Sequence, residues 1–255
     1  MNAKPLTALF AASVLASGCA AVSEPRRVTV MSAGAVKTAF TAASGAWEKA
    51  SGNKVEATFA PAGELRKKIA AGEVADILIV PSENLPEYEK SDAILIATRR
   101  DLGAVAMGAA VRQGARVPDI STPEALRKTL TEARSLTYMD PARGTSGKHF
   151  DESVLPSLGI RDAVRAKTRF GESGFIAEKV ARGEVEIAFH QMTEMLPVAG
   201  VTIVGPLPAS LQKTTVYSGT VMKGAKHPKQ AQQLLDYLAS PEGRKAFLDR
   251  GFTAP

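Results

Sequence analysis

Residues 59–80 read FAPAGELRKKIAAGEVADILIV and contain one complete strand–helix–strand unit. A β-rich run at 55–60 ends at a Pro-Ala-Gly turn, and the following residues place Leu65 and Ile69 on one face of a helix with basic residues outward. A glycine then stops the helix, and residues 75–80 (ADILIV) form the continuous apolar run that is typical of a central parallel strand. This order predicts an α/β fold with a mainly parallel sheet.

The same alternation continues on both sides of this unit. A strand predicted at 28–32 precedes a helix that ends at a glycine, and further strands are predicted at 201–205 and 214–222. The last two segments are helical, and the second begins at Ser240, a typical N-cap residue followed by Pro, and stops at Gly251. The apolar face of the first helix carries Phe40, Ala43, Trp47 and Ala50.

Two segments far apart in the chain have the same pattern. Residues 67–80 (KKIAAGEVADILIV) and 178–190 (EKVARGEVEIAFH) both show a helix end, a Gly, a Glu-Val pair and an apolar strand. Any two α/β units can share a Gly between helix and strand, so a coincidence is the alternative. A true correspondence predicts two similar α/β lobes.

Composition limits the classes of function. The chain has 255 residues, and its 32 Lys and Arg against 26 Asp and Glu give a net charge of +6, which favours anionic ligands. Because the charges are dispersed and aromatic residues make up only 5%, the sequence argues against a nucleic-acid partner. The three histidines, at 149, 190 and 227, lack the close spacing of a zinc site, and we expect no cofactor.

The N-terminus predicts export. The apolar stretch LTALFAASVLASG (6–18) follows a Lys, has the length of a secretory signal and is too short for a permanent membrane span. We therefore expect a signal peptide over residues 1–23 and a periplasmic protein. Cys19, the single cysteine, follows Leu-Ala-Ser-Gly in a pattern similar to a bacterial lipobox, which predicts a lipid anchor; cleavage after Ala21 or Ser23 is the alternative.

Three loops rich in small residues precede predicted helices. They span 32–37 (SAGAVK), 60–65 (APAGEL) and 142–148 (ARGTSGK). The third loop is not a nucleotide P-loop, because Ala142 and His149 stand where that motif needs Gly and Ser or Thr. Unpaired N–H groups at helix starts suit an anion, and in doubly wound sheets such loops gather at one edge. The sequence therefore predicts an anion site.

Five blocks together carry a family resemblance. They are VTVMSAGAVKTAF from residue 28, the block 59–80, DPARGTSGKHF (140–150), ARGEVEIAFHQMTEM (181–195) and YLASPEGRKAFLDRGF (237–252). In order and spacing, essentially the whole mature chain resembles an extracytoplasmic solute-binding protein of the molybdate-binding type, in a branch near aconitate isomerase.

This resemblance implies the type 2 periplasmic binding protein fold. That fold has two α/β lobes, two hinge crossings and a ligand in the cleft between the lobes. By the resemblance, lobe I comprises residues 24–103 and 205–255, and lobe II residues 104–204. It also implies a monomer that hands a small anion to an ABC permease in the membrane.

The ligand residues of molybdate binders are only partly present. In that family a serine from each of the first two loops, amides of the third loop and a late tyrosine surround the oxyanion. These positions fall on Ala35, Gly63 and Gln191, and the substituted residue types favour a small carboxylate over molybdate. Arg143 suits a bidentate clamp for such a carboxylate. The predicted ligand-binding residues are Ser32, Ala35, Gly63, Arg143, Thr145, Ser146, Gln191 and Tyr217.

The second hypothesis is an isomerase of tricarboxylates. Segments 99–121, 190–208 and 214–222 resemble aconitate isomerase, whose reaction needs a base near an acidic C–H and a proton donor. The candidate catalytic residues are His190, Glu194, Lys148 and Tyr217.

Each candidate also has a purely structural interpretation. Arg143 can be a surface charge, Ser32 and Thr145 can cap helices, and Gln191, His190 and Tyr217 can be buried without a ligand. Glu194 can simply face a helix dipole.

Overall fold

The computed structural model describes residues 25–255. The predicted signal peptide and Cys19 lie outside these residues. The strands are β1 (Arg27–Ala33), β2 (Lys54–Ala60), β3 (Ile77–Pro81), β4 (Ile94–Val105), β5 (Met107–Arg112), β6 (Leu136–Tyr138), β7 (Ile187–Gln191), β8 (Val201–Pro206) and β9 (Thr215–Met222). The helices are η1 (Gly34–Val36), α1 (Lys37–Ser51), α2 (Ala62–Ala70), η2 (Ser82–Asn84), α3 (Leu85–Lys90), α4 (Pro123–Glu132), α5 (Thr145–His149), η3 (Phe150–Val154), α6 (Leu155–Ser157), α7 (Arg161–Arg165), α8 (Glu178–Ala181), α9 (Met192–Met195), α10 (Pro228–Ala239) and α11 (Pro241–Leu248).

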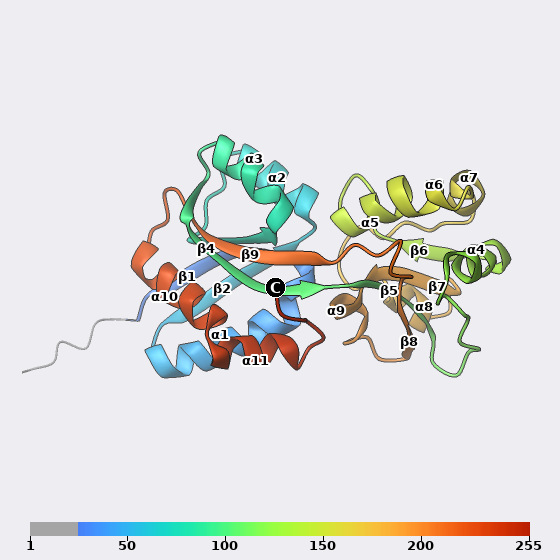
Figure 1. Cartoon of the computed structure of the whole chain (residues 1–255). Coiled ribbons are helices and arrows are strands. Elements are labelled where there is room, and N and C mark those ends of the chain that lie inside the picture. The colour runs from blue at the N-terminus through green and yellow to red at the C-terminus, as the bar shows by residue number, and fades with distance from the viewer. Residues whose placement is uncertain (1–24) are drawn as a thin grey trace, which may run out of the picture.

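The first sheet has the strand order β2-β1-β3-β9-β4 and helices on both faces (Figure 1). Side chains alternate across β3, so Ile77 and Ile79 pack against α1, α10 and α11, while Leu78 and Val80 pack against α2 and α3. Covering both faces explains why this strand is apolar without interruption. We call this sheet and its helices lobe I.

The second sheet has the order β6-β7-β5-β8 and is also covered on both faces. Phe189 of β7 and Leu126 of α4 belong to the core on one face, to which η3, α6 and α7 also contribute. Ala188, one residue earlier, packs with Val180 of α8 and Met195 of α9 on the other face. We call this sheet and its helices lobe II.

Both sheets are mixed, which corrects the prediction of a mainly parallel sheet. Within residues 25–255, the parallel pairs are β1–β2, β1–β3 and β6–β7. The pairs β3–β9, β4–β9, β5–β7 and β5–β8 are antiparallel. The sequence signal failed because β9 and β5 each lie between two neighbouring strands and are buried along most of their length, as parallel strands are.

The repeated Gly-Glu-Val pattern corresponds to a repeated structure. Gly72 (φ 89°) follows α2 and Gly183 (φ 74°) follows α8, and each turns the chain into a strand. Those strands, β3 and β7, each have one parallel and one antiparallel neighbour. The two lobes therefore share this local arrangement.

Most predicted elements are confirmed to within a few residues. Helix α1 buries Phe40, Ala43 and Trp47 and ends at Gly52 (φ 72°), but Ala50 is exposed. Ile69 is half-buried rather than buried, because it packs against the edge of the core that Leu65 enters. In the described part of the chain, no helix is long and apolar enough to cross a membrane.

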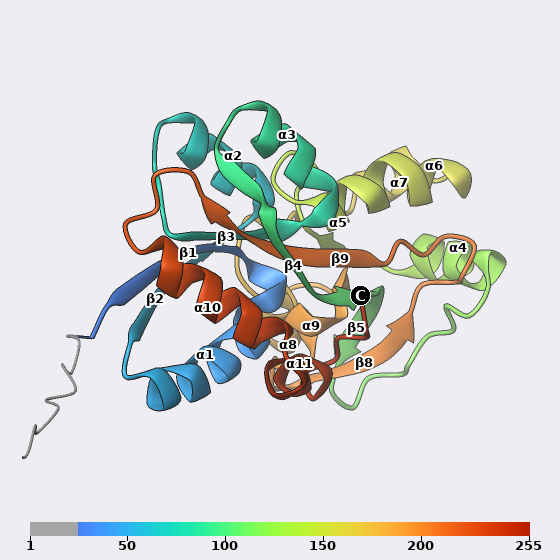
Figure 2. The ribbon, with the colours of Figure 1, turned by 60° about the vertical axis from the view of Figure 1, so that its left-hand side comes forward.

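The chain crosses between the lobes twice. Ala106 alone separates β4 from β5, and residues 207–214 connect β8 to β9. Figure 2 shows β4 and β9 side by side as they run toward lobe II. The helix starts after β1, β2 and β6 thus come together between the lobes.

Candidate functional site

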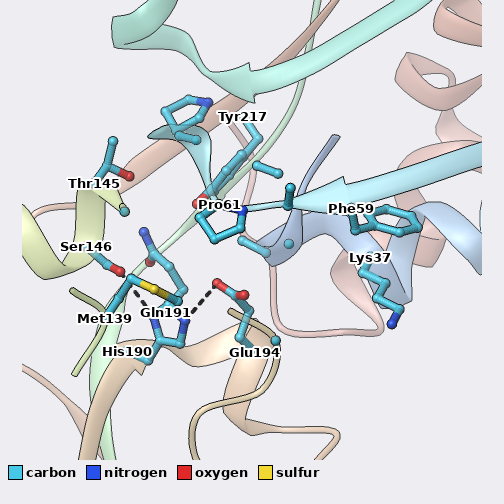
Figure 3. Close-up of a pocket in the computed structure, with 18 of the residues that line it drawn as sticks. Lys37, Phe59, Pro61, Met139, Thr145, Ser146, His190, Gln191, Glu194 and Tyr217 are labelled. Atoms are coloured by element: carbon cyan, nitrogen blue, oxygen red, sulfur yellow. Dashed lines mark hydrogen bonds and ion pairs between the residues drawn. The ribbon is translucent and has the colours of Figure 1, made fainter. Parts of the chain in front are cut away.

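A small cavity of about 110 Å³ lies between the lobes (Figure 3). Both lobes contribute to it, from the ends of strands and the starts of helices. Its lining comprises Ala33, Gly34, Ala35, Lys37, Phe59, Ala60, Pro61, Ala62, Pro81, Met139, Gly144, Thr145, Ser146, Gly174, Phe175, His190, Gln191, Glu194 and Tyr217.

Three helix starts face this cavity. The residues before them are Ala33, Pro61 and Gly144, and within residues 25–255 no side chain caps any of the three. The first N–H groups of a helix have no partner inside the helix and carry the positive end of its dipole. The helix starts therefore suit negative charge; at α2 the N–H groups of Gly63 and Glu64 already have backbone acceptors, so there the dipole contributes more than free donors.

Gly63 and Arg143 join the two lobes instead of facing the cavity. The Gly63 N–H donates to the Arg143 carbonyl over 2.9 Å, and a Cβ at Gly63 would lie 2.9 Å from the Ala142 carbonyl oxygen. Arg143 Nη2 lies 3.7 Å from Glu64 Oε2, and both side chains are partly exposed. The Arg143 guanidinium thus pairs with lobe I at the surface, contrary to the predicted carboxylate clamp.

Ser146, His190 and Glu194 form a connected row on the lobe II side of the cavity (Figure 3). The hydroxyl of Ser146 lies 3.0 Å from His190 Nδ1, and His190 Nε2 lies 3.2 Å from Glu194 Oε2. The second contact has ion-pair distance but not the alignment of a hydrogen bond. His190 is in β7 and Glu194, four residues later, is in α9, which follows β7 directly. The side chains of Ser146, His190 and Glu194 are all buried.

Tyr217 and Gln191 form the hinge-side wall of the cavity. Burial of the phenol, followed by the charge of Glu194, raises the pKa of Tyr217 well above its usual value of 10. Gln191 Nε2 donates to the Thr215 hydroxyl over 3.0 Å, and Gln191 Oε1 is buried without a hydrogen-bond partner in residues 25–255. Tyr217 is therefore a neutral hydroxyl, next to an amide oxygen that a ligand could satisfy.

Lys37, Phe59 and Phe175 also line the cavity, and the sequence analysis missed them. Lys37 Nζ lies 5.9 Å from the ring centre of Phe59 and 5.5 Å from that of Phe175, so it contacts aromatic rings from both lobes. Lys37 does follow the first small-residue loop directly, which is the signal that could have identified it.

The predicted site residues separate into two groups. Ala35, Thr145, Ser146, Gln191 and Tyr217 line the cavity, as do His190 and Glu194 from the isomerase hypothesis. Ser32, Gly63, Arg143 and Lys148 are not in its lining. Ser32 is fully buried and donates to the Ala33 carbonyl over 3.2 Å, whereas Lys148 is exposed.

Comparisons with known proteins agree with this architecture. The family model described as bacterial extracellular solute-binding protein matches residues 28–253. An aconitate isomerase from Pseudomonas sp is 34% identical over 252 residues, which cover 97% of this chain and 95% of that protein. The molybdate-binding protein ModA of Escherichia coli is 26% identical, with 96% of each chain covered. The solved structure of the Azotobacter vinelandii periplasmic molybdate-binding protein superposes with a TM-score of 0.75 at 18% identity, covering 89% of this chain and 99% of that one.

Proposed function

The chain belongs to the bacterial extracellular solute-binding proteins and has the type 2 periplasmic binding fold, and from this premise we propose that it is an ABC-importer receptor for a small organic carboxylate. The ligand would lie between the lobes, in the cavity formed by the three helix starts. The convergence of these uncapped starts is the observation that carries the proposal.

The residue types in the cavity favour a carboxylate over a tetrahedral oxyanion. By the resemblance, molybdate binders would have hydroxyls at the positions of Ala35, Gly63 and Gln191, and this chain has none there. The hydroxyls available in the lining belong to Thr145, Ser146 and Tyr217. They lie together with apolar groups such as Phe59, which would accommodate a carbon skeleton better than a symmetric ion.

The receptor role includes export and a membrane partner. A signal peptide within residues 1–23 would direct the chain to the periplasm. Cleavage before Cys19 would leave that residue to carry a lipid that holds the protein at the membrane, whereas cleavage after Ala21 or Ser23 would release it. As a monomer, the closed protein would present both lobes to the permease. Closure excludes water and strengthens the charge-assisted bonds to the anion.

A thermal-shift screen of the mature protein tests this function. The ligands are succinate, malate, citrate, cis- and trans-aconitate, with molybdate, tungstate and sulfate as the oxyanion set. A true ligand at a hundredfold excess over its dissociation constant should stabilise the protein by about 2.7 kcal/mol. Stabilisation by molybdate and not by any carboxylate would refute the organic-anion assignment.

The buried His190–Glu194 pair favours a second candidate, isomerisation of a tricarboxylate. In this reaction Glu194 would remove a proton from the methylene carbon beside a carboxylate, with His190 holding its other oxygen. The electron pair of the broken C–H bond forms a new double bond to the central carbon. The electron pair of the original double bond then takes up the proton at the far alkene carbon, which leaves Glu194 deprotonated again.

Proton NMR of trans-aconitate with the protein measures conversion to the cis isomer. Turnover by the wild type that is lost in Glu194→Gln would establish the isomerase activity. No turnover by the wild type at high protein concentration would exclude that activity.

A further inference from the structure

Glu194 brings a carboxylate into a cavity that is otherwise suited to anions. Its side chain is buried, and among the described residues its one ion-pair partner is His190. It reaches from α9 of lobe II to the first loop of lobe I, where Oε1 would lie only 2.7 Å from a Cβ at Gly34. The carboxylate therefore lies beside the start of the first helix, close to where an anionic ligand would be held.

A second anion placed against this carboxylate would be repelled. The repulsion between like charges is strong where water is excluded, and no Lys or Arg in residues 25–255 forms an ion pair with Glu194. A ligand atom that carries a hydrogen changes the sign of the contact, because the carboxylate then accepts a charge-assisted hydrogen bond.

Two neighbouring groups, Gln191 and Ser146, present acceptors on this side. Gln191 Nε2 is occupied by Thr215, which leaves the buried Oε1 of Gln191 as an acceptor without a partner. The Ser146 hydroxyl, if it donates to His190 Nδ1, presents lone pairs to the cavity. One part of the cavity lining thus offers acceptors, and the helix starts beside it offer donors.

We infer that Glu194 makes the receptor selective for small hydroxy acids, whose carboxylate lies at the helix starts and whose hydroxyl donates to Glu194. This inference rests on the proposed receptor function and narrows its ligand class. Fully deprotonated oxyanions such as molybdate and sulfate have no hydrogen to donate and are rejected by the same group.

Calorimetric titration with matched acids tests the inference. Succinate and L-malate differ by one hydroxyl, as do tricarballylate and citrate. A buried charged acceptor left without its partner is costly, so we expect each hydroxy acid to bind at least about tenfold more tightly than its partner at pH 7.5. In Glu194→Gln this ratio should fall to within about threefold, and molybdate affinity should rise. Glu152→Gln, at an exposed position of lobe II, is the matched control and should keep the wild-type ratio.

The outcomes separate the inference from the function on which it rests. Equal binding of both members of a pair by the wild type, or an unchanged ratio in Glu194→Gln, overturns the role of Glu194 while the receptor function stands. Binding of no carboxylate at all overturns both. If Glu194→Gln does not fold, the wild-type ratios are compared with those of Glu194→Asp, which keeps the charge but withdraws it from the cavity. An unchanged ratio in the Asp variant contradicts the inference.

Discussion

At the scale of single residues, two glycines differ in what surrounds their missing side chain. A Cβ at Gly147 in α5 would lie 1.8 Å from the Met139 carbonyl oxygen, a backbone atom that cannot move aside. A Cβ at Gly45 in α1 would meet nothing within 4 Å. We expect Gly147→Ala to lower the free energy of unfolding by roughly 3 kcal/mol and Gly45→Ala to raise it by about 0.5–1 kcal/mol. Urea unfolding measures both, and similar effects for the two variants would contradict the close packing of the third loop.

Tyr217 makes stability depend on alkaline pH. Its pKa is raised above 10 in the folded protein, so above pH 10 the unfolded chain loses the phenolic proton while the folded chain retains it. The contribution of Tyr217 is therefore complete below pH 10 and is lost as pH rises toward the folded pKa, by up to about 1.4 kcal/mol per pH unit. Tyr217→Phe should flatten the decline in unfolding free energy between pH 10 and 11. Tyr237→Phe, on α10, is the tyrosine control; an equal slope in wild type and Tyr217→Phe would argue against burial of the phenol.

At the scale of elements, one buried carboxylate holds the third loop's helix in place. Asp151 lies in η3, a π-helical segment directly after α5, and is fully buried. It accepts hydrogen bonds from the Tyr138 hydroxyl of β6 (2.7 Å) and from Arg161 Nη2 of α7 (2.6 Å), with Arg165 also in contact. These contacts fix the direction in which α5 enters the cavity.

Removal of this carboxylate should therefore lower the free energy of unfolding strongly. We expect Asp151→Ala to cost about 3–5 kcal/mol, because a buried charged network loses its centre. Arg161→Gln should cost much less, since Arg161 is partly exposed and Arg165 remains. Chemical denaturation measures both changes. Equal losses would show that the ion pair, rather than the buried network, carries the stability.

Much of the fold could be predicted from periodicity, and the site only in part. Strands β1 to β3 and helices α1 and α2 follow from apolar patterns of short range, and the cavity loops follow from their small residues. Strand direction could not be predicted, because the neighbours of β9 come from the other end of the chain. The orientation of Arg143 depends on Glu64, and that of Glu194 on Gly34, and both contacts cross between lobes. No local pattern contains such information.

At the scale of the whole molecule, the Arg143–Glu64 pair is one of several contacts between the lobes. The Arg143–Glu64 pair is partly exposed, and exposed pairs contribute about 0–1 kcal/mol. We expect Arg143→Ala to weaken ligand binding by less than about fivefold and equally for every acid, since the backbone bond from Gly63 remains. Titration of Arg143→Ala with succinate and L-malate measures this. A large loss, or a loss confined to one acid, would mean that Arg143 contacts the ligand after all.

The unequal crossings have a mechanical consequence. Gln212, in the longer crossing, accepts from the Met107 N–H over 2.9 Å and donates to the Met107 carbonyl over 2.7 Å, at the end of the one-residue crossing. The two crossings are therefore joined at Met107, directly beyond the last β4–β9 pair, and we expect the lobes to rotate about this region rather than slide past each other. Opening then requires breaking the backbone bond between Gly63 and the Arg143 carbonyl and the weak surface pair, together with the contacts that Lys37 and Glu194 make with the opposite lobe. We therefore expect the rate at which a captured molecule escapes to depend on these inter-lobe contacts as well as on the groups that recognise it.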